Sequence, residues 1–176
     1  MENLNDVLNS LNGLLGNTDL SEVSAESAGF SELPDGYYLA EVEKAELKES
    51  KSSHQPMVAF QFKITDDGLT PDENGDLVTV KKTKGRKIFM YYVLKDENSV
   101  RRFATDMLKF EGENPGEPIL SKDYFTNSEL LVDALDILKG SRVYIQSSTT
   151  INDDDSTSVW KNLISWKRAA ALELPL

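Results

Sequence analysis

The sequence predicts a mainly β domain whose helices come late in the chain order, and three observations lead to this prediction. Over residues 57–64, Val58, Phe60, Phe62 and Ile64 recur at every second position with Ala59, Gln61 and Lys63 between them, which is the period of a strand with one buried face. The segment before them is also strand-like but changes parity partway along. After residue 36, helical patterns occur only between residues 96 and 140.

The first 35 residues differ in composition from the rest. Apolar residues recur at spacings of three and four over residues 1–16, which would line one face of a short helix. Residues 17–35 are rich in Ser, Glu, Gly and Ala without a basic residue, as in a flexible acidic linker. Three alternatives stay open for the apolar face. It packs on the chain's own domain, on a partner protein, or on a second copy in a homo-oligomer. The apolar positions are Leu4, Val7, Leu8, Leu11, Leu14 and Leu15.

The strand predicted from Tyr37 onward has two sets of apolar positions with opposite parity. A β-bulge at Glu43 or Lys44 would bring both sets onto one side of the strand. Such a bend lets one long strand serve two sides of a barrel. The first set is Tyr38, Ala40 and Val42, and the second is Ala45 and Leu47.

Two helices are predicted after strands over residues 77–80 and 86–94, which flank a turn at Lys84-Gly85. The first helix has an apolar stripe over residues 100–108, with its N-cap among residues 96–99 and Gly112 as its C-cap. The second helix begins at a capping box. That box is Thr126-Asn127-Ser128-Glu129, and Gly140 ends the helix.

Two final strands, over residues 143–146 and 159–166, are expected to form a hairpin. Three strands, an α region and then a hairpin is the chain order of the OB fold, a five-stranded Greek-key barrel whose strand 2–3 face binds oligonucleotides. The sequence therefore predicts an OB-like barrel over residues 36–168, with the α region between strands 3 and 4. A short C-terminal tail, 169–176, would follow.

A basic and aromatic run inside an acidic chain is the main indication of function. The formal net charge is -11, yet residues 81–109 carry nine basic and three acidic side chains. Basic residues interleaved with aromatics on a strand suit a surface that holds phosphates and stacks on bases, and this run falls on the third barrel strand. The predicted phosphate contacts are Lys81, Lys82, Lys84, Arg86 and Lys87, with Arg101, Arg102 and Lys109 as outliers, and the predicted base-stacking residues are Phe89, Tyr91 and Tyr37.

Two phases of the third strand remain open. Either Lys87, Phe89 and Tyr91 point outward, or their neighbours do, because both sets contain apolar side chains. Trp160 and Trp166 are expected in the core, with a stacking platform at a strand end as the alternative.

The composition excludes several other kinds of site. The chain has no Cys and a single His, so a disulfide framework or a thiolate zinc site is excluded. It contains no phosphate-binding loop, dinucleotide fingerprint or nucleophile elbow, so we expect no enzyme activity, cofactor or metal. Asp66-Asp67 and Asp153-Asp154-Asp155 are expected to stabilise turns. Without a signal-peptide or membrane-span pattern, the protein is expected to be soluble and intracellular, with no membrane partner.

The sequence also permits a different class of protein, a small β-rich interaction or virion-assembly module without nucleic-acid binding. The acidic arm would then be its adhesive segment, and the basic turn would serve solubility. A net charge of -11 favours this alternative because it repels DNA. A basic patch can still act locally, since the screening length at physiological salt is about 8 Å.

The stretch Gly36–Val42, continued by Lys44–Ser52 and Pro56–Phe62, resembles phage replication-module proteins of a domain-of-unknown-function family that are taken to bind single-stranded DNA. Gly85–Phe89 and residues 98–112 match their middle portion. The resemblance covers about residues 36–112. It implies a barrel that coats single strands during phage DNA replication or recombination in the cytoplasm of the bacterial host.

The C-terminus departs from single-strand-binding proteins, which commonly end in an acidic tail with an apolar tip. This chain ends in Leu172-Glu173-Leu174-Pro175-Leu176 after the basic Lys167-Arg168. The acidic arm, residues 1–36, is therefore the expected contact for other replication or recombination proteins.

Overall fold

The computed structural model describes residues 4–17, 33–112, 114 and 116–175, which belong to two compact units, 1–32 and 33–176. The first unit contains helix α1 (Leu4–Asn17), in agreement with the helix expected there. Most of the expected acidic linker, residues 18–32, lies outside the described residues. Within the described ranges, no helix is long and apolar enough to cross a membrane.

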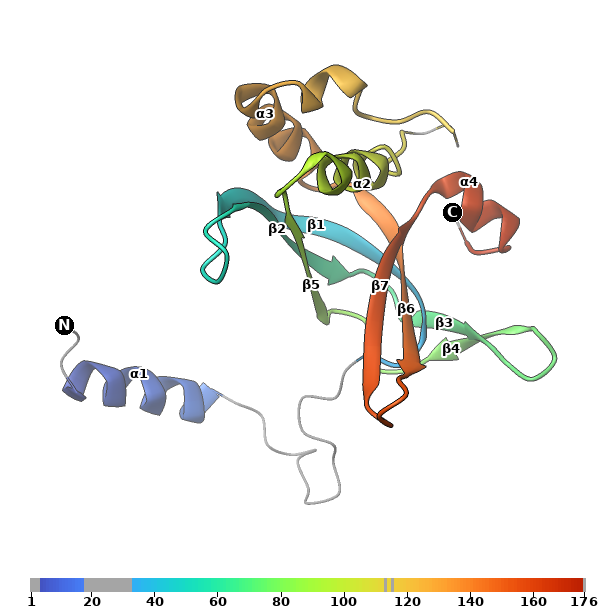
Figure 1. The fold of residues 1–176 in the computed structure, drawn as a ribbon. Coiled ribbons are helices and arrows are strands. Elements are labelled where there is room, and N and C mark those ends of the chain that lie inside the picture. The colour runs from blue at the N-terminus through green and yellow to red at the C-terminus, as the bar shows by residue number, and fades with distance from the viewer. Residues whose placement is uncertain (1–3, 18–32, 113, 115, 176) are drawn as a thin grey trace. The chain divides into compact units, whose positions relative to one another are not determined.

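The second unit is built on an open antiparallel sheet of seven strands (Figure 1). Its helices are α2 (Glu97–Met107), the 3-10 helix η1 (Lys122–Phe125), α3 (Ser128–Leu138) and α4 (Trp166–Ala171). The strands are β1 (Gly36–Glu49), β2 (Pro56–Ile64), β3 (Gly68–Pro71), β4 (Leu77–Val80), β5 (Lys87–Val93), β6 (Arg142–Ile151) and β7 (Thr157–Ile164).

The predicted class, mainly β with helices, is confirmed, whereas a closed five-stranded barrel is not. β2 lies between β1 and β5, and β6 joins β1 to β7. Among the described strands, β5 pairs only with β2 and β7 only with β6, so the sheet stays open between β5 and β7.

The expectation of three strands before the helices was wrong, because five strands precede α2. The predicted strand over residues 77–80 exists as β4, but it pairs with β3 in a separate hairpin and not with the strand after Lys84-Gly85. Figure 1 shows this green hairpin projecting from the sheet. Gly68 begins it under the ring of Tyr38, where an added Cβ would lie 2.3 Å from a ring carbon.

The β-bulge in the first strand is confirmed at Glu43. The register with β2 shifts between Val42 and Lys44, so Glu43 is the extra residue on β1. Val42 and Ala45 are both buried as a result, although they are three positions apart in the chain. The bulge lets β1 keep one apolar side through its whole length while it bends.

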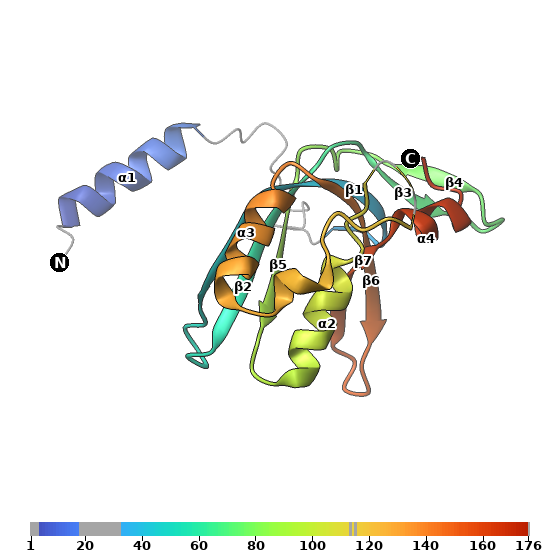
Figure 2. The same cartoon turned by 90° about the horizontal axis from the view of Figure 1, so that it is seen from above.

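The inner side of the sheet holds an aromatic core. The Phe60 and Phe62 rings stack at a centroid distance of 5.5 Å, and both also stack on Phe110. Helix α2 packs against β5 and α3 against β1, so the helices cover the same apolar side (Figure 2). Burial of side chains of this size contributes roughly 1.5–3 kcal/mol each, which makes this core the main source of stability.

The helix boundaries differ slightly from the predicted ones. Asp96 caps α2 in a capping box with Ser99, within the predicted range, but α2 ends at Met107 and not near Gly112. Asn127, not Thr126, caps α3 by accepting a hydrogen bond from the Leu130 amide at 2.9 Å. A one-residue shift leaves the apolar face of α3 unchanged.

A second apolar cluster covers the outer side of β6 and of the start of β1. Its centre is formed by Tyr144, Ile164, Ala169 and Leu174. The Trp166 ring meets Tyr144 edge-on at 5.7 Å, and its indole N–H donates to the carbonyl of Glu111 at 3.3 Å. Residues 169–176, expected as a tail, therefore include part of α4 and the buried Leu174.

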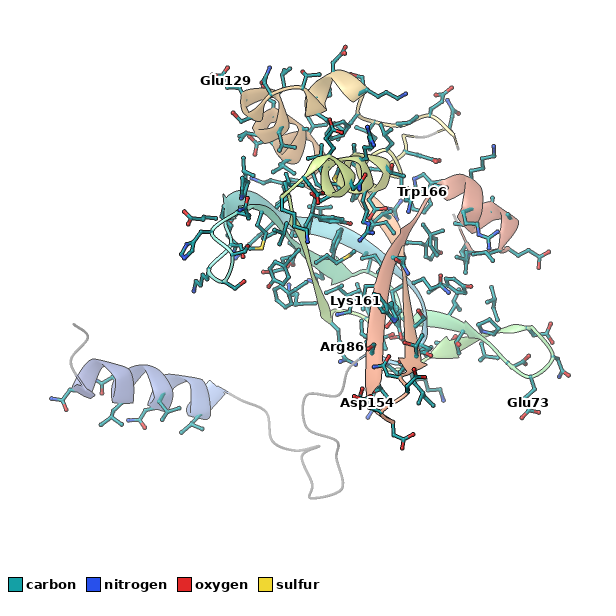
Figure 3. The ribbon with its side chains drawn as sticks, viewed as in Figure 1. Glu73, Arg86, Glu129, Asp154, Lys161 and Trp166 are labelled. Atoms are coloured by element: carbon teal, nitrogen blue, oxygen red, sulfur yellow. The ribbon has the colours of Figure 1, made fainter. Side chains whose placement is uncertain are left out.

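The core position expected for Trp160 was wrong. Its side chain is 55% exposed on β7, and its indole N–H donates to the Thr150 hydroxyl at 2.9 Å. Trp166 is half-buried in the second cluster and begins α4, as Figure 3 shows. The two residues do not share one environment, because β7 ends between them.

Candidate nucleic-acid interface

The phase of β5 is resolved in favour of outward-facing aromatics. Ile88 is 1% exposed in the core, whereas Phe89 is 48% and Tyr91 57% exposed. Met90 and Tyr92 are half-buried against the core. Phe89 and Tyr91 therefore stand on the outer side of the sheet, which we call the outer β1–β2–β5 face.

The strand register builds this face in rows that cross three strands. One row is Glu46, Ala59 and Tyr91, and the next is Lys44, Gln61 and Phe89. Between the rows lies a hollow of about 210 Å³, lined by both aromatic rings and by side chains from β1 and β2. The rings are thus accessible on one wall of a shallow depression.

Three lysines on this face were missed by the sequence analysis. Lys44 and Lys48 project from β1 after the bulge, and Lys63 lies opposite Lys87 on β2. All three are exposed. The signal was present, since each lysine lies next to an apolar residue in the chain, at Ala45, Leu47 and Ile64. Placing the three lysines on the side of Phe89 required the bulge and the strand order.

Lys87 lies on the face but is held by a carboxylate. Its ammonium donates to both carboxylate oxygens of Glu43, at 2.5 and 2.6 Å, and the Gln61 amide donates to Glu43 Oε2 at 2.8 Å. The hydrogen bond from Lys87 and then that from Gln61 hold the pKa of Glu43 below its ordinary value. The bulge residue thus competes with any phosphate for Lys87.

The outer face as a whole is nearly neutral. It carries four lysines, and three glutamates lie among them and offset most of their charge. The lysines are Lys44, Lys48, Lys63 and Lys87, and the glutamates are Glu41, Glu43 and Glu46. Its attraction for a polyanion is therefore modest. Exposed aromatic surface, more than charge, distinguishes this face.

The basic turn before β5 has a fixed backbone. Asp67 accepts hydrogen bonds from the amides of Thr83 and Lys84 at 3.0 and 2.9 Å, and those bonds, that of Lys84 first, lower the pKa of Asp67. Gly85 has φ +86°, a conformation that favours glycine in such a turn. The side chains of Lys81, Lys82 and Lys84 are exposed there, next to the end of the outer face where Lys87 lies.

Arg86 does not join the predicted phosphate contacts on the outer face. Its carbonyl accepts from the Ile64 amide at 2.9 Å, which continues the β2 pairing, so its side chain shares the side of Ile88. It is half-buried near the start of β5 (Figure 3). Burial raises the pKa of the Tyr38 hydroxyl to about 12 even though the Arg86 charge opposes that rise. Alternation along β5 separates Arg86 from Lys87.

The structure places Tyr37 apart from Phe89 and Tyr91. It is half-buried in the second cluster, opposite Leu69 of β3 and Gln146 of β6. Lys44, which aligns with Phe89, lies seven positions further along β1, about 23 Å at 3.3 Å per residue. Tyr37 therefore cannot stack on the same bases as Phe89.

The outlying basic residues lie on or just after α2. Lys109 donates to Asp106 at 2.8 Å, and Asp106 also accepts from the Tyr92 hydroxyl at 2.9 Å. Burial, then the Asp106 charge, raises the pKa of Tyr92. Arg101 lies 3.5 Å from Glu97 on the exposed side of α2. Lys109 thus stabilises the junction of α2 with β5, which is a structural role.

The acidic turns behave as turn stabilisers. Asp67 supports the basic turn as described, and Asp154 accepts from the Ser156 amide at 3.0 Å at the tip of the β6–β7 hairpin (Figure 3). Within the part of the chain that the structure describes, no three His, Asp or Glu side chains are placed to hold a metal ion.

Fold and face together define a small, mainly antiparallel β protein with an exposed aromatic and lysine-bearing sheet surface. The chain belongs to the family described as "Protein of unknown function (DUF669)", whose profile matches residues 16–111. The match includes β1 to β5 and α2, so all of the outer face lies within it. Comparison with curated proteins finds no match.

Proposed function

We propose that this protein is a non-catalytic single-stranded DNA-binding protein that coats single strands during phage DNA replication or recombination. The observation that carries the proposal is the pair of exposed rings, Phe89 and Tyr91, on a strand face flanked by lysines. Bases of an unpaired strand expose both π faces, and aromatic side chains stack on them whatever the sequence.

The spacing of the two rings suits an extended strand. Phe89 and Tyr91 are two residues apart on β5, so their Cα atoms lie about 7 Å apart along one side. Large apolar side chains exposed together favour an interaction surface over a solvated one. The neighbouring Lys44, Lys48 and Lys63 would reach phosphates while the bases stack.

The strand order supports an OB-like arrangement. Five strands follow one another in space as β5, β2, β1, β6 and β7, with α2, η1 and α3 between β5 and β6 in the chain. In an OB fold the strands that are second and third in chain order bind the oligonucleotide on their face. Those strands correspond to β2 and β5, which carry Lys63, Phe89 and Tyr91.

The experiment that tests the proposal is a fluorescence-anisotropy titration with a labelled single-stranded oligonucleotide of mixed sequence. The wild type should bind the single strand more tightly than the duplex. The double variant F89A/Y91A should lose about 2 to 6 kcal/mol of binding free energy, at about 1 to 3 kcal/mol per stacked base. W160A removes an equally exposed ring on β7 and should bind as the wild type does. Absence of binding at micromolar protein and low salt would contradict the proposal.

A second candidate function is a protein-interaction or virion-assembly module. An apolar hollow of about 320 Å³ between α2, α3 and the adjoining strand ends favours it, with Val100, Phe103 and Leu131 in its lining. Leu8, Leu11 and Leu15 of α1 are also exposed, and a single helix cannot bury its own apolar face.

Under the first function, single-strand binding, α1 would instead recruit other replication or recombination proteins.

A further inference from the structure

The hollow between Phe89 and Tyr91 contains more than stacking rings. Its floor is Ala59, the smallest side chain on the outer side of β2, and Glu46 stands on the far side of Ala59 from Tyr91. Two strand spacings, about 10 Å, separate the Glu46 and Tyr91 backbones. A base stacked on Tyr91 and extended over Ala59 would therefore present its edge to the Glu46 carboxylate.

The orientation of Gln61 is fixed beside the same hollow. Its amide nitrogen donates to Glu43 Oε2 at 2.8 Å, and a carboxylate can only accept, so nitrogen and oxygen of the amide cannot be exchanged without losing that bond. The amide oxygen is the branch not held by Glu43. Glu46 and Gln61 thus supply acceptor oxygens from two strands.

Acceptor oxygens select among bases by their hydrogen-bond edges. Cytosine presents an amino group at N4, from which Glu accepts, whereas thymine presents the O4 acceptor at the equivalent position. Placing O4 against a carboxylate sets two acceptors in contact with no proton between them. Lys44 and Lys48 would contact phosphates, which are the same for both nucleotides, so these lysines do not distinguish cytosine from thymine.

We infer that the hollow discriminates between bases, with Glu46 as the specificity-determining residue that favours cytosine over thymine. This inference rests on the proposed single-strand binding and names its base preference. The carboxylate is exposed, so water competes for it and the expected preference is about tenfold, at the lower end of what one good base contact provides.

The test compares oligo-dC and oligo-dT of equal length at slightly basic pH, where cytosine N3 is unprotonated. The wild type should bind oligo-dC about tenfold more tightly, and E46Q, whose amide can also donate to O4, should bring the ratio close to one. E41Q removes the same charge from the same side of β1 outside the hollow and should keep the wild-type ratio. The ratio cancels the general gain in affinity that loss of a negative charge brings.

The outcomes separate the inference from the function on which it rests. If both oligonucleotides fail to bind, the proposed function is wrong. If the wild type binds both, with equal affinity or with oligo-dT preferred, single-strand binding stands and the base preference is overturned. A preference for oligo-dC that E46Q leaves intact overturns the role of Glu46.

Discussion

Two aromatic groups stand on the outer side of the same sheet, and only one of them is covered. Phe89 and Tyr91 on β5 are about half exposed, whereas Tyr144 on β6 is buried under the C-terminal segment, whose Trp166 packs edge-on against it. Phe89, Tyr91 and Tyr144 all lie at outward positions of their strands. The difference comes from α4 and Leu174, which cover one region and leave the other open.

This difference shows what strand alternation can and cannot establish. Alternation determines which side chains share a side of the strand. Whether that side is exposed to solvent depends on another element. For Tyr37, which belongs to the covered second cluster, that element is α4, more than 120 residues further along the chain. The covered group stabilises the fold, and the open group is left for binding.

The largest expected effect breaks the covered group. Y144A should lower the free energy of unfolding by about 3–5 kcal/mol, because this ring is 3% exposed, contacts Trp166 and donates its hydroxyl proton to the Pro175 carbonyl. Y91A, the same change on the open face, should stay within about 0.5 kcal/mol of the wild type. Urea unfolding followed by circular dichroism measures both. Equal losses would mean that the open face is covered in solution.

Binding should show the reverse order. Y91L keeps an apolar side chain but removes the π face, and should cost about 1–3 kcal/mol of single-strand affinity. Y37L makes the same change in the second cluster and should leave the affinity of the folded protein unchanged. Anisotropy titrations at a temperature where both variants are folded make the comparison. A loss for Y37L as large as that for Y91L would restore Tyr37 to the binding surface.

Salt dependence sharpens the comparison for the lysines. K44A and K63A should each reduce the slope of log affinity against log salt by about 0.7, the contribution of one phosphate contact to a single strand. K167A, an exposed lysine on α4 beside the covered group, should leave the slope unchanged. Titrations at several salt concentrations give the slopes. An unchanged slope for K63A would remove β2 from the phosphate path.

The sequence predicted the local features well because each has a local cause. The bulge at Glu43 follows from the parity change within β1, and the Asp96 cap and the strand over residues 57–64 follow from neighbouring residues. The mainly β class followed from the same patterns. Phe89, Tyr91 and Lys87 were placed together because they are consecutive outward positions on one strand.

The rest of the candidate site depended on distant contacts. Lys44 and Lys63 reach Phe89 only through pairing of β1, β2 and β5, and Arg86 was separated from Lys87 by the phase of β5. The β3–β4 hairpin could not be predicted because the pattern of residues 77–80 indicates a strand but not its partner. The same pattern suits pairing with β3, as observed, or with the strand after Lys84-Gly85. The capture of Lys87 by Glu43 required the bulge to aim that carboxylate across β2.

The smallest expected effect concerns that Glu43–Lys87 pair. Because the pKa of Glu43 is below its ordinary value of 4.5 in the folded protein, the pair stabilises the fold above the unfolded pKa, and this contribution is lost as the pH falls through the lowered folded pKa. The stability difference between the wild type and E43Q should therefore be present at neutral pH and vanish in acid. Carboxyl NMR titration should place the Glu43 midpoint below 4.5 in the wild type and nearer 4.5 in K87A, which removes the largest cause of the shift, with Q61A giving a smaller rise. A midpoint that K87A does not move would mean that Lys87 is not held by Glu43 in solution and is available to phosphate, and the outer face would then bind with a correspondingly steeper salt dependence.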